Sequence, residues 1–332
     1  MTTAATTLLR ARGVGRRYAG VQALAPLDLD VRAGEVLAIV GENGAGKSTL
    51  LKVIAGVIAP SEGTLSVAGP DGAWREARFR SVRDAADAGI ALVHQELNLA
   101  ENLDVAGCIF LGREPHRAGF MDLRAMHRDA RTWMDRVGLD VDPATPCGAL
   151  PIAQQQLVEI AKALSCRARI LVLDEPTSSL SAREADRLLA IVRDLRSQGT
   201  AVVFVSHHLD EVTAIADRVL VLRDGRVSGE LARGAFDRAT MERLMVGRDL
   251  AAAARREPQP VARVRLRTVG VVSAHRRARP TTVELREGEV VGIAGLVGAG
   301  RTEFLEAIAG IAPHARSEEH TSELQSPCNL VC

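Results

Sequence analysis

The chain has 332 residues, of which 47% are hydrophobic and 25% are charged, and its formal net charge at pH 7 is +1. That length is enough for roughly two domains, and the composition is that of an ordinary globular protein. The balanced charge gives no electrostatic argument for a nucleic-acid partner. No apolar run reaches the roughly 18 residues that a membrane helix needs, and Met1–Arg10 lacks a secretory signal pattern. We therefore expect a protein of the cytosol, whose contact with a membrane comes through a partner.

The first part of the chain alternates between strand and helix patterns. Residues Leu8 to Arg32 alternate loosely between apolar and polar, which predicts an antiparallel β layer, and later short apolar runs predict buried strands. Strands and helices of these lengths predict an α/β domain with a mostly parallel sheet covered on both faces. We expect the strands at 35–40, 90–94, 170–173 and 201–206, helices at 47–58 and 182–197, and an inserted helical subdomain at about 97–165.

A glycine-rich loop, Gly41-Glu-Asn-Gly-Ala-Gly-Lys47-Ser48-Thr49, lies between the first buried strand and the helix after it. It fits G-x-x-x-x-G-K-[ST], in which backbone N–H groups turn onto phosphate oxygens, the lysine reaches the β- and γ-phosphates and the hydroxyl holds Mg²⁺. Lysine is rare in this chain, where arginine supplies most of the positive charge. A lysine at position 47 therefore indicates that its ammonium group is needed for the chemistry of the loop. We expect the nucleotide to be bound by Gly41, Asn43, Gly44, Gly46, Lys47, Ser48 and Thr49, with Ser48 also a metal ligand.

The same loop pattern returns near the end as Gly295-Leu-Val-Gly-Ala-Gly-Arg301-Thr302, with arginine in the place of lysine. A planar guanidinium does not replace a compact ammonium between phosphates. The stretch Glu289–Ala294 before it repeats Glu35–Val40, so a second domain is expected to restart the plan of the first. We predict a first domain at 1–248, a polar linker at 249–262 and the start of a second, unequal domain at 263–315 that is too short to close a core.

The last stretch, 316–332, reads RSEEHTSELQSPCNLVC and has no apolar period. It matches a one-frame translation of a common short-read sequencing adapter. We therefore expect that these residues come from read-through into adapter, and that the genuine sequence of the protein is cut off at about Ala315. The cysteines before it, Cys108, Cys147 and Cys166, have no metal-ligand spacing and are expected to be reduced thiols.

Two acidic residues, Asp174 and Glu175, follow the strand expected at 170–173. The end of the strand would place Asp174 near Mg²⁺, and Glu175 would face the γ-phosphate and polarise the attacking water. An acidic turn after a strand is the alternative interpretation. The intact phosphate loop upstream favours the catalytic one.

With these residues the chain resembles the ATP-binding cassette (ABC) family. The resemblance implies that Gln95 senses the γ-phosphate and Mg²⁺, that His207 contacts the γ-phosphate and that Tyr18 stacks on adenine. His208 does not match the motif position and is expected to be a bystander. A single residue of any of these types is most often structural, but all three occur in the family's order around an intact loop.

The segment Leu150-Pro151-Ile152-Ala153-Gln154 stands where the family carries its L-S-G-G-Q signature. The resemblance implies that this signature caps the γ-phosphate bound by an opposite cassette, at a helix N-terminus. Pro151 removes a hydroxyl and an N–H donor, and Ala153 replaces a glycine. In a head-to-tail pair of cassettes one composite site would then be degenerate and the other hydrolytic. The degenerate site would contain Pro151, Ala153, Gln154, Gly295, Gly298, Gly300, Arg301 and Thr302.

A closer resemblance, over about Leu8 to Ala312, is to the twin-cassette ATPases of bacterial monosaccharide importers. It rests on stretches such as His94-Gln-Glu-Leu97 and Gln154-Gln-Gln-Leu-Val-Glu-Ile-Ala-Lys-Ala163. It implies ATP and Mg²⁺ as cofactors, two membrane permease subunits as partners, contacted through about Asn98–Gly112, and an indirect link to an extracytoplasmic sugar-binding protein. It also implies a peripheral location on the cytoplasmic face of the inner membrane and no nucleic-acid partner.

Two other functions remain open from the sequence. A soluble twin-cassette ATPase acting on ribosomes or nucleic acid is one, although such proteins typically carry a standard signature and a long basic linker. A nucleotide-binding fragment without turnover is the other. Because the chain ends before a second signature, we expect it to bind ATP and to hydrolyse it weakly.

Overall fold

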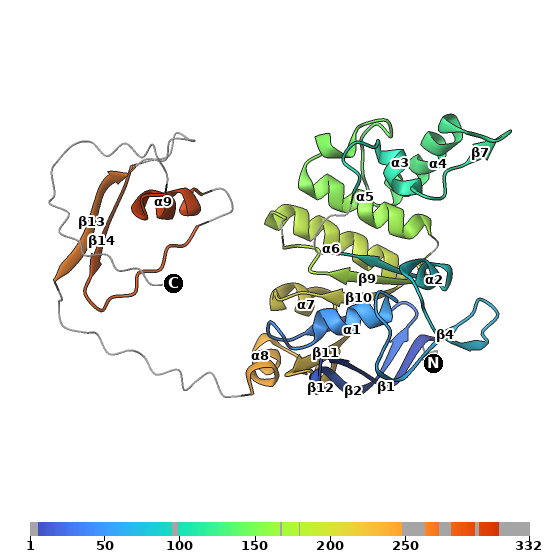
Figure 1. Cartoon of the computed structure of the whole chain (residues 1–332), viewed down its shortest axis with the longest axis horizontal. Coiled ribbons are helices and arrows are strands. Elements are labelled where there is room, and N and C mark those ends of the chain that lie inside the picture. The colour runs from blue at the N-terminus through green and yellow to red at the C-terminus, as the bar shows by residue number, and fades with distance from the viewer. Residues whose placement is uncertain are drawn as a thin grey trace. The chain divides into compact units, whose positions relative to one another are not determined.

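The computed structural model describes residues 6–94, 99–166, 168–178, 180–247, 263–271, 280–295 and 299–311. The chain divides into two compact units, Met1–Ala252 and Ala253–Cys332, which are treated separately below (Figure 1). Gln95 and Gly298, two positions singled out in the sequence, lie outside the described residues, as does the stretch 316–332.

A six-stranded sheet forms the centre of the first unit, in the order β12-β11-β3-β10-β9-β6. The inner pairs are parallel, and β12 runs antiparallel to β11 at the edge. Continuous apolar runs suit these strands because both faces of the sheet are covered. The predicted parallel α/β sheet is confirmed. Its strands are β3 (Val36–Val40), β6 (Ile90–Val93), β9 (Ile170–Asp174), β10 (Ala201–Val205), β11 (Arg218–Arg223) and β12 (Arg226–Ala232).

An antiparallel sheet in the order β2-β1-β4-β5 lies on one side of this centre. Its strands are β1 (Thr7–Tyr18), β2 (Val21–Arg32), β4 (Glu62–Ala68) and β5 (Trp74–Glu76). Helix α1 (Lys47–Ile54) contacts both β2 and β9, and the apolar side chains of α1 and the two sheets form one buried cluster. The predicted N-terminal antiparallel β layer is therefore confirmed.

The helix expected at 47–58 is shorter than predicted. It ends at Ile54, with Ala55 at its C-terminus and Gly56 at a positive φ of 69°. A residue with a left-handed backbone commonly ends a helix, and glycine adopts it without a Cβ penalty. The apolar residues that follow continue into the turn toward β4 rather than into another helical turn.

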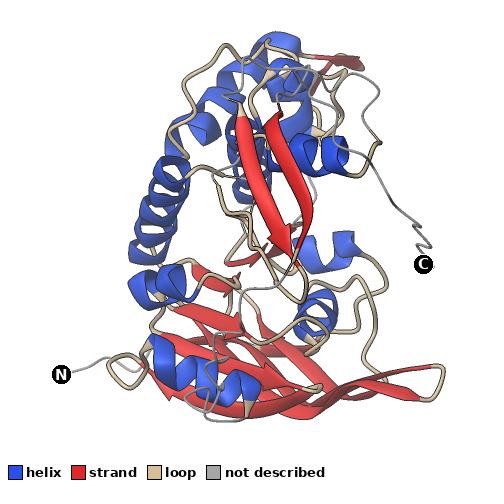
Figure 2. Cartoon of the chain, turned by 90° about the vertical axis from the view of Figure 1, so that its left-hand side faces the viewer, coloured by secondary structure: helices blue, strands red, loops and turns tan. Residues whose placement is uncertain are grey.

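The other side of the central sheet carries most of the helices (Figures 1 and 2). A large apolar cluster joins α3, α4, α5 and α6 to the sheet. The stretch expected to be helical also contains a short exposed hairpin, β7 (His116–Arg117) with β8 (Phe120–Met121), which the charge-rich pattern did not predict. The remaining elements are α2 (Val82–Asp87), α3 (Val105–Phe110), α4 (Leu123–Arg136), the 3₁₀ turn η1 (Cys147–Ala149), α5 (Ile152–Ser165), α6 (Ala182–Ser197), α7 (Leu209–Ile215) and α8 (Arg238–Val246).

The described part of the second unit consists of β13 (Val264–Val271), β14 (Thr281–Arg286) and α9 (Arg301–Ile308), with β13 and β14 paired antiparallel. The expectation that Glu289–Ala294 would repeat strand β3 is wrong, because residues 289–295 form no strand and are exposed. Strand β3 receives ladder bonds from β10 and β11 on its two sides. Among the described residues of the second unit, no strand pairs with 289–295, so the backbone of this segment lacks the hydrogen bonds that β3 receives from its neighbours.

None of the helices in the described part of the chain is long and apolar enough to cross a membrane.

Candidate functional site

The first loop connects β3 to α1 and holds its lysine in a buried position. The Lys47 side chain turns back over the loop, and its Nζ donates to the carbonyl oxygens of Gly41 at 2.8 Å and Glu42 at 2.9 Å. The residue is only 7% exposed. Burial lowers the pKa of the ammonium group below its ordinary value, against the attraction of Glu175 and Asp174. A cation held in this way stays at the centre of the loop, where a phosphate would meet it.

The glycines of the loop are required by close contacts and by backbone geometry. A Cβ at Gly41 would lie 2.4 Å from the carbonyl oxygen of Leu222, and one at Gly46 would lie 2.9 Å from that of Ala23. Gly46, the residue before α1, has a φ of 98°. The turn between β11 and β12 supports the loop from below, where the Gly225 N–H donates to the carbonyl oxygen of Ala45 at 3.2 Å. The loop therefore leaves its backbone open toward a ligand at the start of α1.

The carboxyl ends of β9 and β10 bring the two candidate catalytic residues together. Val205 is paired with Asp174 in the parallel ladder, so the residues that follow these two strands lie side by side. The Oε2 atom of Glu175 lies 3.1 Å from Nδ1 of His207. Glu175 has a positive φ of 47°, an uncommon backbone for a residue with a side chain. Such outliers gather at functional sites, where the surrounding structure holds them in place.

A further residue, Glu211 in the first turn of α7, ties these two strand ends to each other. Its Oε2 accepts hydrogen bonds from the hydroxyls of Thr177 at 2.8 Å and Ser206 at 3.0 Å. Both hydroxyl-bearing residues are buried. Sequence reasoning missed Glu211, because its partners follow two different strands. Its place one turn after the histidine, on the helix that begins there, was the available signal.

Asp174 sits at the end of β9 with its carboxylate partly buried. Burial is the main cause that raises its pKa above the ordinary value, and the neighbouring charge of Glu175 acts in the same direction. Two adjacent carboxylates that repel each other are stabilised by a divalent cation. The Asp174 carboxylate and the Ser48 hydroxyl are hard oxygen ligands of the kind Mg²⁺ prefers. The residues present therefore fit a Mg²⁺ ion bound together with phosphate.

Tyr18 lies at the end of β1 with its ring exposed, and the guanidinium of Arg16 sits 4.8 Å from the ring centre. Tyr18 is paired with Val21 of β2, and two residues further Ala23 contacts the loop at Gly46. An exposed ring near the loop is available for stacking on a base. His208 stacks at a tilt on His207, with ring centres 4.1 Å apart. The described contacts place no hydrogen bond between His208 and Glu175.

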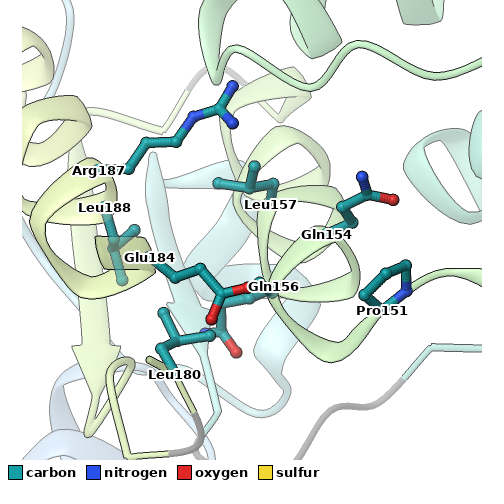
Figure 3. Close-up of a pocket in the computed structure, with 9 residues that line it drawn as sticks. Pro151, Gln154, Gln156, Leu157, Leu180, Glu184, Arg187 and Leu188 are labelled. Atoms are coloured by element: carbon teal, nitrogen blue, oxygen red, sulfur yellow. The ribbon is translucent and has the colours of Figure 1, made fainter. Parts of the chain in front are cut away.

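Pro151, the first altered residue of the signature-like segment, precedes α5 and provides no side-chain cap for it. Behind it lies a pocket of about 160 Å³ between α5 and α6. Figure 3 shows Gln156 and Leu157 of α5 on the side of that helix that faces α6. Gln156 is buried, and its Nε2 atom has no hydrogen-bond partner among the described residues. The pocket is lined by Pro151, Ala153, Gln154, Gln156, Leu157, Leu180, Glu184, Arg187 and Leu188.

The second loop keeps only part of this geometry. Gly300 precedes α9 with a φ of 83°, close to that of Gly46, and the Phe304 N–H donates to its carbonyl oxygen at 3.0 Å. Arg301 and Thr302 are exposed, and so is Gly295. Within the described part of the second unit, the start of the helix is formed but the strand that should carry the loop is not.

A glycine loop at the start of a helix, a buried lysine and acidic residues at the end of β9, which lies two strands from β3 in the same parallel sheet, are the features of a P-loop nucleotide-binding cassette. Residues 24–178 match the family described as ABC transporter. This segment, a little less than half of the chain, is therefore similar to the ABC transporter family. Two solved structures share the fold. One is an ATP-binding cassette of an ABC transporter in its ADP conformation, with a TM-score of 0.62 and 22% identity over 73% of this chain and 98% of that one. The other is a dimeric cassette bound to ADP and Pi, with a TM-score of 0.59 and 24% identity over 69% of this chain and 100% of that one.

Among curated proteins, the chain is 49% identical over 92% of its length to a "Putative ribose/galactose/methyl galactoside import ATP-binding protein 1" of Burkholderia ambifaria, of which it covers 58%. It is 44% identical over 92% of its length to "Ribose import ATP-binding protein RbsA 3" of Rubrobacter xylanophilus, of which it covers 61%. It is also 42% identical over 98% of its length to "Ribose import ATP-binding protein RbsA" of Rhodopirellula baltica, of which it covers 65%. The chain thus spans about three fifths of the length of these relatives.

Proposed function

We propose that this protein is an ATP-binding and ATP-hydrolysing subunit that energises the import of a monosaccharide through an ABC permease. The observation that carries the hydrolytic part is the contact of Glu175 with His207, 3.1 Å apart at the carboxyl edge of the sheet that also carries the Lys47 loop. The names of the relatives, which are ribose and galactose import ATP-binding proteins, support sugar import as the coupled process.

In this proposal the first loop binds the triphosphate. The N–H groups of the loop and of the start of α1 donate to phosphate oxygens, and the Lys47 ammonium exchanges its two carbonyl acceptors for phosphate oxygens. Ser48, Asp174 and Gln95 are the residues that would hold Mg²⁺, which when bound neutralises charge on the phosphates. Tyr18 offers its exposed ring to the base.

Glu175 then acts as the base that polarises the attacking water. A carboxylate beside an imidazole can accept a proton from water while His207 orients toward the γ-phosphate. Glu211 positions both groups, because it holds the turn that follows Glu175 and the serine that precedes His207. The rigid connection matters because small misplacements of catalytic groups cost large factors in rate.

Hydrolysis is tested by phosphate release from purified chain with Mg²⁺ and ATP. Glu175→Gln keeps the size of the side chain but removes its basicity, and is expected to lower the rate about 100-fold or more while ATP binding remains. Glu76→Gln, the same change at an exposed position of β5, serves as the matched control and is expected to leave the rate unchanged. Equal rates in Glu175→Gln and the unsubstituted chain would refute the catalytic assignment.

The same proposal expects slow turnover by the chain alone. The signature that caps the γ-phosphate is supplied by another cassette in this family's arrangement, so residues 1–315 should bind ATP well and release phosphate slowly. The signature of the chain itself is altered at Pro151 and Ala153, and the lysine of its second loop is replaced by Arg301. These changes favour one good hydrolytic site and one degenerate site in the assembled protein.

The proposed partners are two permease subunits in the membrane and, through them, an extracytoplasmic sugar-binding protein. The chain would then sit as a peripheral protein on the cytoplasmic face of the membrane. Fractionation of cells that express a tagged chain together with related sugar permease subunits tests this placement. Recovery with the membranes, dependent on the permease, is the expected result. Recovery with ribosomes would favour the soluble twin-cassette alternative.

A further inference from the structure

Two cysteines that are far apart in the sequence meet inside the helical part of the first unit. Cys108 belongs to α3 and Cys147 begins η1, and their Sγ atoms lie 2.9 Å apart although 39 positions separate them in the chain. Both residues are buried. Their sequence spacing gives no sign of this pair, since the contact arises from the fold and not from a local motif.

Backbone hydrogen bonds before and after Cys147 hold its segment against the residues that precede Cys108, and so keep the two sulfur atoms close together. The Cys147 N–H donates to the carbonyl oxygen of Leu103 at 2.8 Å, and the Gly148 N–H donates to that of Glu101 at 3.1 Å. On the other side of Cys147, the Val105 N–H donates to the carbonyl oxygen of Thr145 at 3.0 Å. The segment around Cys147 is thus laid along the residues that lead into α3, and the contact does not depend on one flexible side chain.

The two thiols differ in chemical character. The Cys147 thiol donates a hydrogen bond to Cys108, which lowers the pKa of the Cys108 thiol, and the same contact raises the pKa of Cys147. The thiolate is the reactive form of cysteine. Cys108 is therefore the better first nucleophile, and Cys147 is placed to attack it in a second step. Cys166, which follows the last residue of α5, instead donates to the Lys162 carbonyl at 3.4 Å.

We propose that Cys108 and Cys147 are a site of reversible oxidation to a disulfide. The oxidant is a two-electron thiol oxidant such as an azodicarboxamide. The Cys108 thiolate adds to one nitrogen of the azo group, and the Cys147 sulfur then attacks the Cys108 sulfur and displaces the hydrazine. One S–S bond forms, both thiol hydrogens end on the two nitrogens, and the azo compound is reduced by two electrons.

This bond would fix α3 to the turn that leads into Leu150–Gln154. Cys147 is joined to that segment directly, because the Leu150 N–H donates to the Cys147 carbonyl at 3.1 Å. Oxidation would therefore restrict the motion of the turn that precedes the signature-like segment. Reaction requires the helical part to open locally so that the oxidant reaches buried sulfur, and such local openings occur in native proteins well below global unfolding. The proposal does not depend on the proposed transport function.

The test is oxidation of the native, fully reduced chain with diamide, followed by mass spectrometry of a non-reducing digest. The expected result is a peptide pair joining Cys108 to Cys147, reversed by dithiothreitol, with Cys166 still available for alkylation. A second experiment uses the chain with Cys166→Ser, Cys328→Ser and Cys332→Ser, in which the pair holds the only thiols. There the intact mass should fall by the two thiol hydrogens, and the further change Cys147→Ser should abolish that loss.

Formation of the Cys108–Cys147 bond only in urea, or its absence from the native chain at every diamide concentration, would overturn the proposal. Both experiments are needed because the unsubstituted chain reports on the pair even if the serine variants fold poorly. Preferential linkage of Cys108 to any other cysteine would overturn it as well.

Discussion

The two units of the chain contain nearly the same loop, yet only one of them builds a site around it. In both, a glycine with a φ above 80° precedes the helix, and the helix begins with the same type of backbone hydrogen bond. In the first unit the loop is carried by a strand in the middle of a sheet, and its lysine is buried. In the second, the residues before the loop are exposed and unpaired, and its arginine is exposed.

The difference shows which parts of the site are local and which are not. The helix start is a local feature, because glycine and a few helix-forming residues are enough to form it. The loop is supported by Ala23 of β2, Leu222 of β11 and Gly225 of the β11–β12 turn, which are distant from it in the sequence. A matching motif therefore predicts where a phosphate could bind, while the neighbouring strands decide whether it does.

The largest expected effect concerns the repeated glutamate that begins each apolar run. Glu35 is buried and paired with Arg218, with contacts of 2.8 and 3.0 Å, whereas Glu289 is exposed and accepts a hydrogen bond from the Arg286 N–H. Removing Glu35 leaves the buried Arg218 with the more exposed Glu230, 2.6 Å away, as its remaining ion-pair partner. Glu35→Ala is expected to lower the free energy of unfolding by about 3 kcal/mol, and Glu289→Ala by less than about 0.5 kcal/mol. Urea unfolding followed by circular dichroism measures both, and equal effects would contradict the comparison.

The basic residues of the two loops provide the second test. Lys47→Ala removes charge-assisted hydrogen bonds to phosphate and is expected to weaken ATP binding about 10- to 100-fold. Arg301→Ala should leave the affinity within about twofold, because an exposed side chain on an incomplete loop contributes little. Fluorescence titration with a labelled ATP analogue measures both. A larger loss in Arg301→Ala than in Lys47→Ala would reverse the assignment of the site.

Glu211 has no counterpart in the described part of the second unit and should matter for both stability and rate. Glu211→Ala leaves the buried hydroxyls of Thr177 and Ser206 without their acceptor, which costs about 1–3 kcal/mol of stability. Hydrolysis should fall roughly tenfold through misplacement of Glu175 and His207, with the loss in kcat and little change in KM. Glu211→Gln keeps one acceptor oxygen and should restore part of the rate. A pure loss of stability with unchanged kcat would show that Glu211 is only structural.

The smallest effect is expected at the glycines before the two helices. Alanine at either position must adopt a positive φ, which costs about 1–2 kcal/mol. At Gly46 the added Cβ would also lie 2.9 Å from the Ala23 carbonyl oxygen, while the nearest atom to one at Gly300 is 4.0 Å away. Gly46→Ala should therefore lower the urea midpoint of the first unit, and Gly300→Ala should leave it unchanged. Equal midpoints would mean that the Ala23 carbonyl of β2 does not limit the space at Gly46.

The fold of the first unit was predictable from sequence because its strands and helices carry strong patterns. The helix at 182–197 was predicted to the residue, since Ser181 and Glu184 form a capping box at its start. The end of α1 and the β7–β8 hairpin were not predicted, because they depend on a glycine turn and on two-residue strands. The strand expected at 289–294 failed for a different reason, since a strand needs partners that its own residues do not specify.

The site was predictable where a motif is contiguous and not where distant segments meet. Asp174, Glu175 and His207 lie at or just after the ends of β9 and β10, where parallel-sheet topology places such residues, and Lys47 begins the helix that follows β3. Glu211 and the Cys108–Cys147 pair are contacts between segments far apart in sequence, which no local pattern indicates. The roles of all these residues stay predictions, and Gln95 and Gly298 lie outside the described residues.

The central claim is that the chain holds one nucleotide site, formed by its first loop. Isothermal titration of the full chain with ATP and Mg²⁺ tests it most directly, because it gives the number of sites as well as the affinity. We predict one ATP bound per chain, with that binding lost or strongly weakened in Lys47→Ala. Two equal sites per chain, or one site that survives Lys47→Ala and disappears in Arg301→Ala, would contradict it.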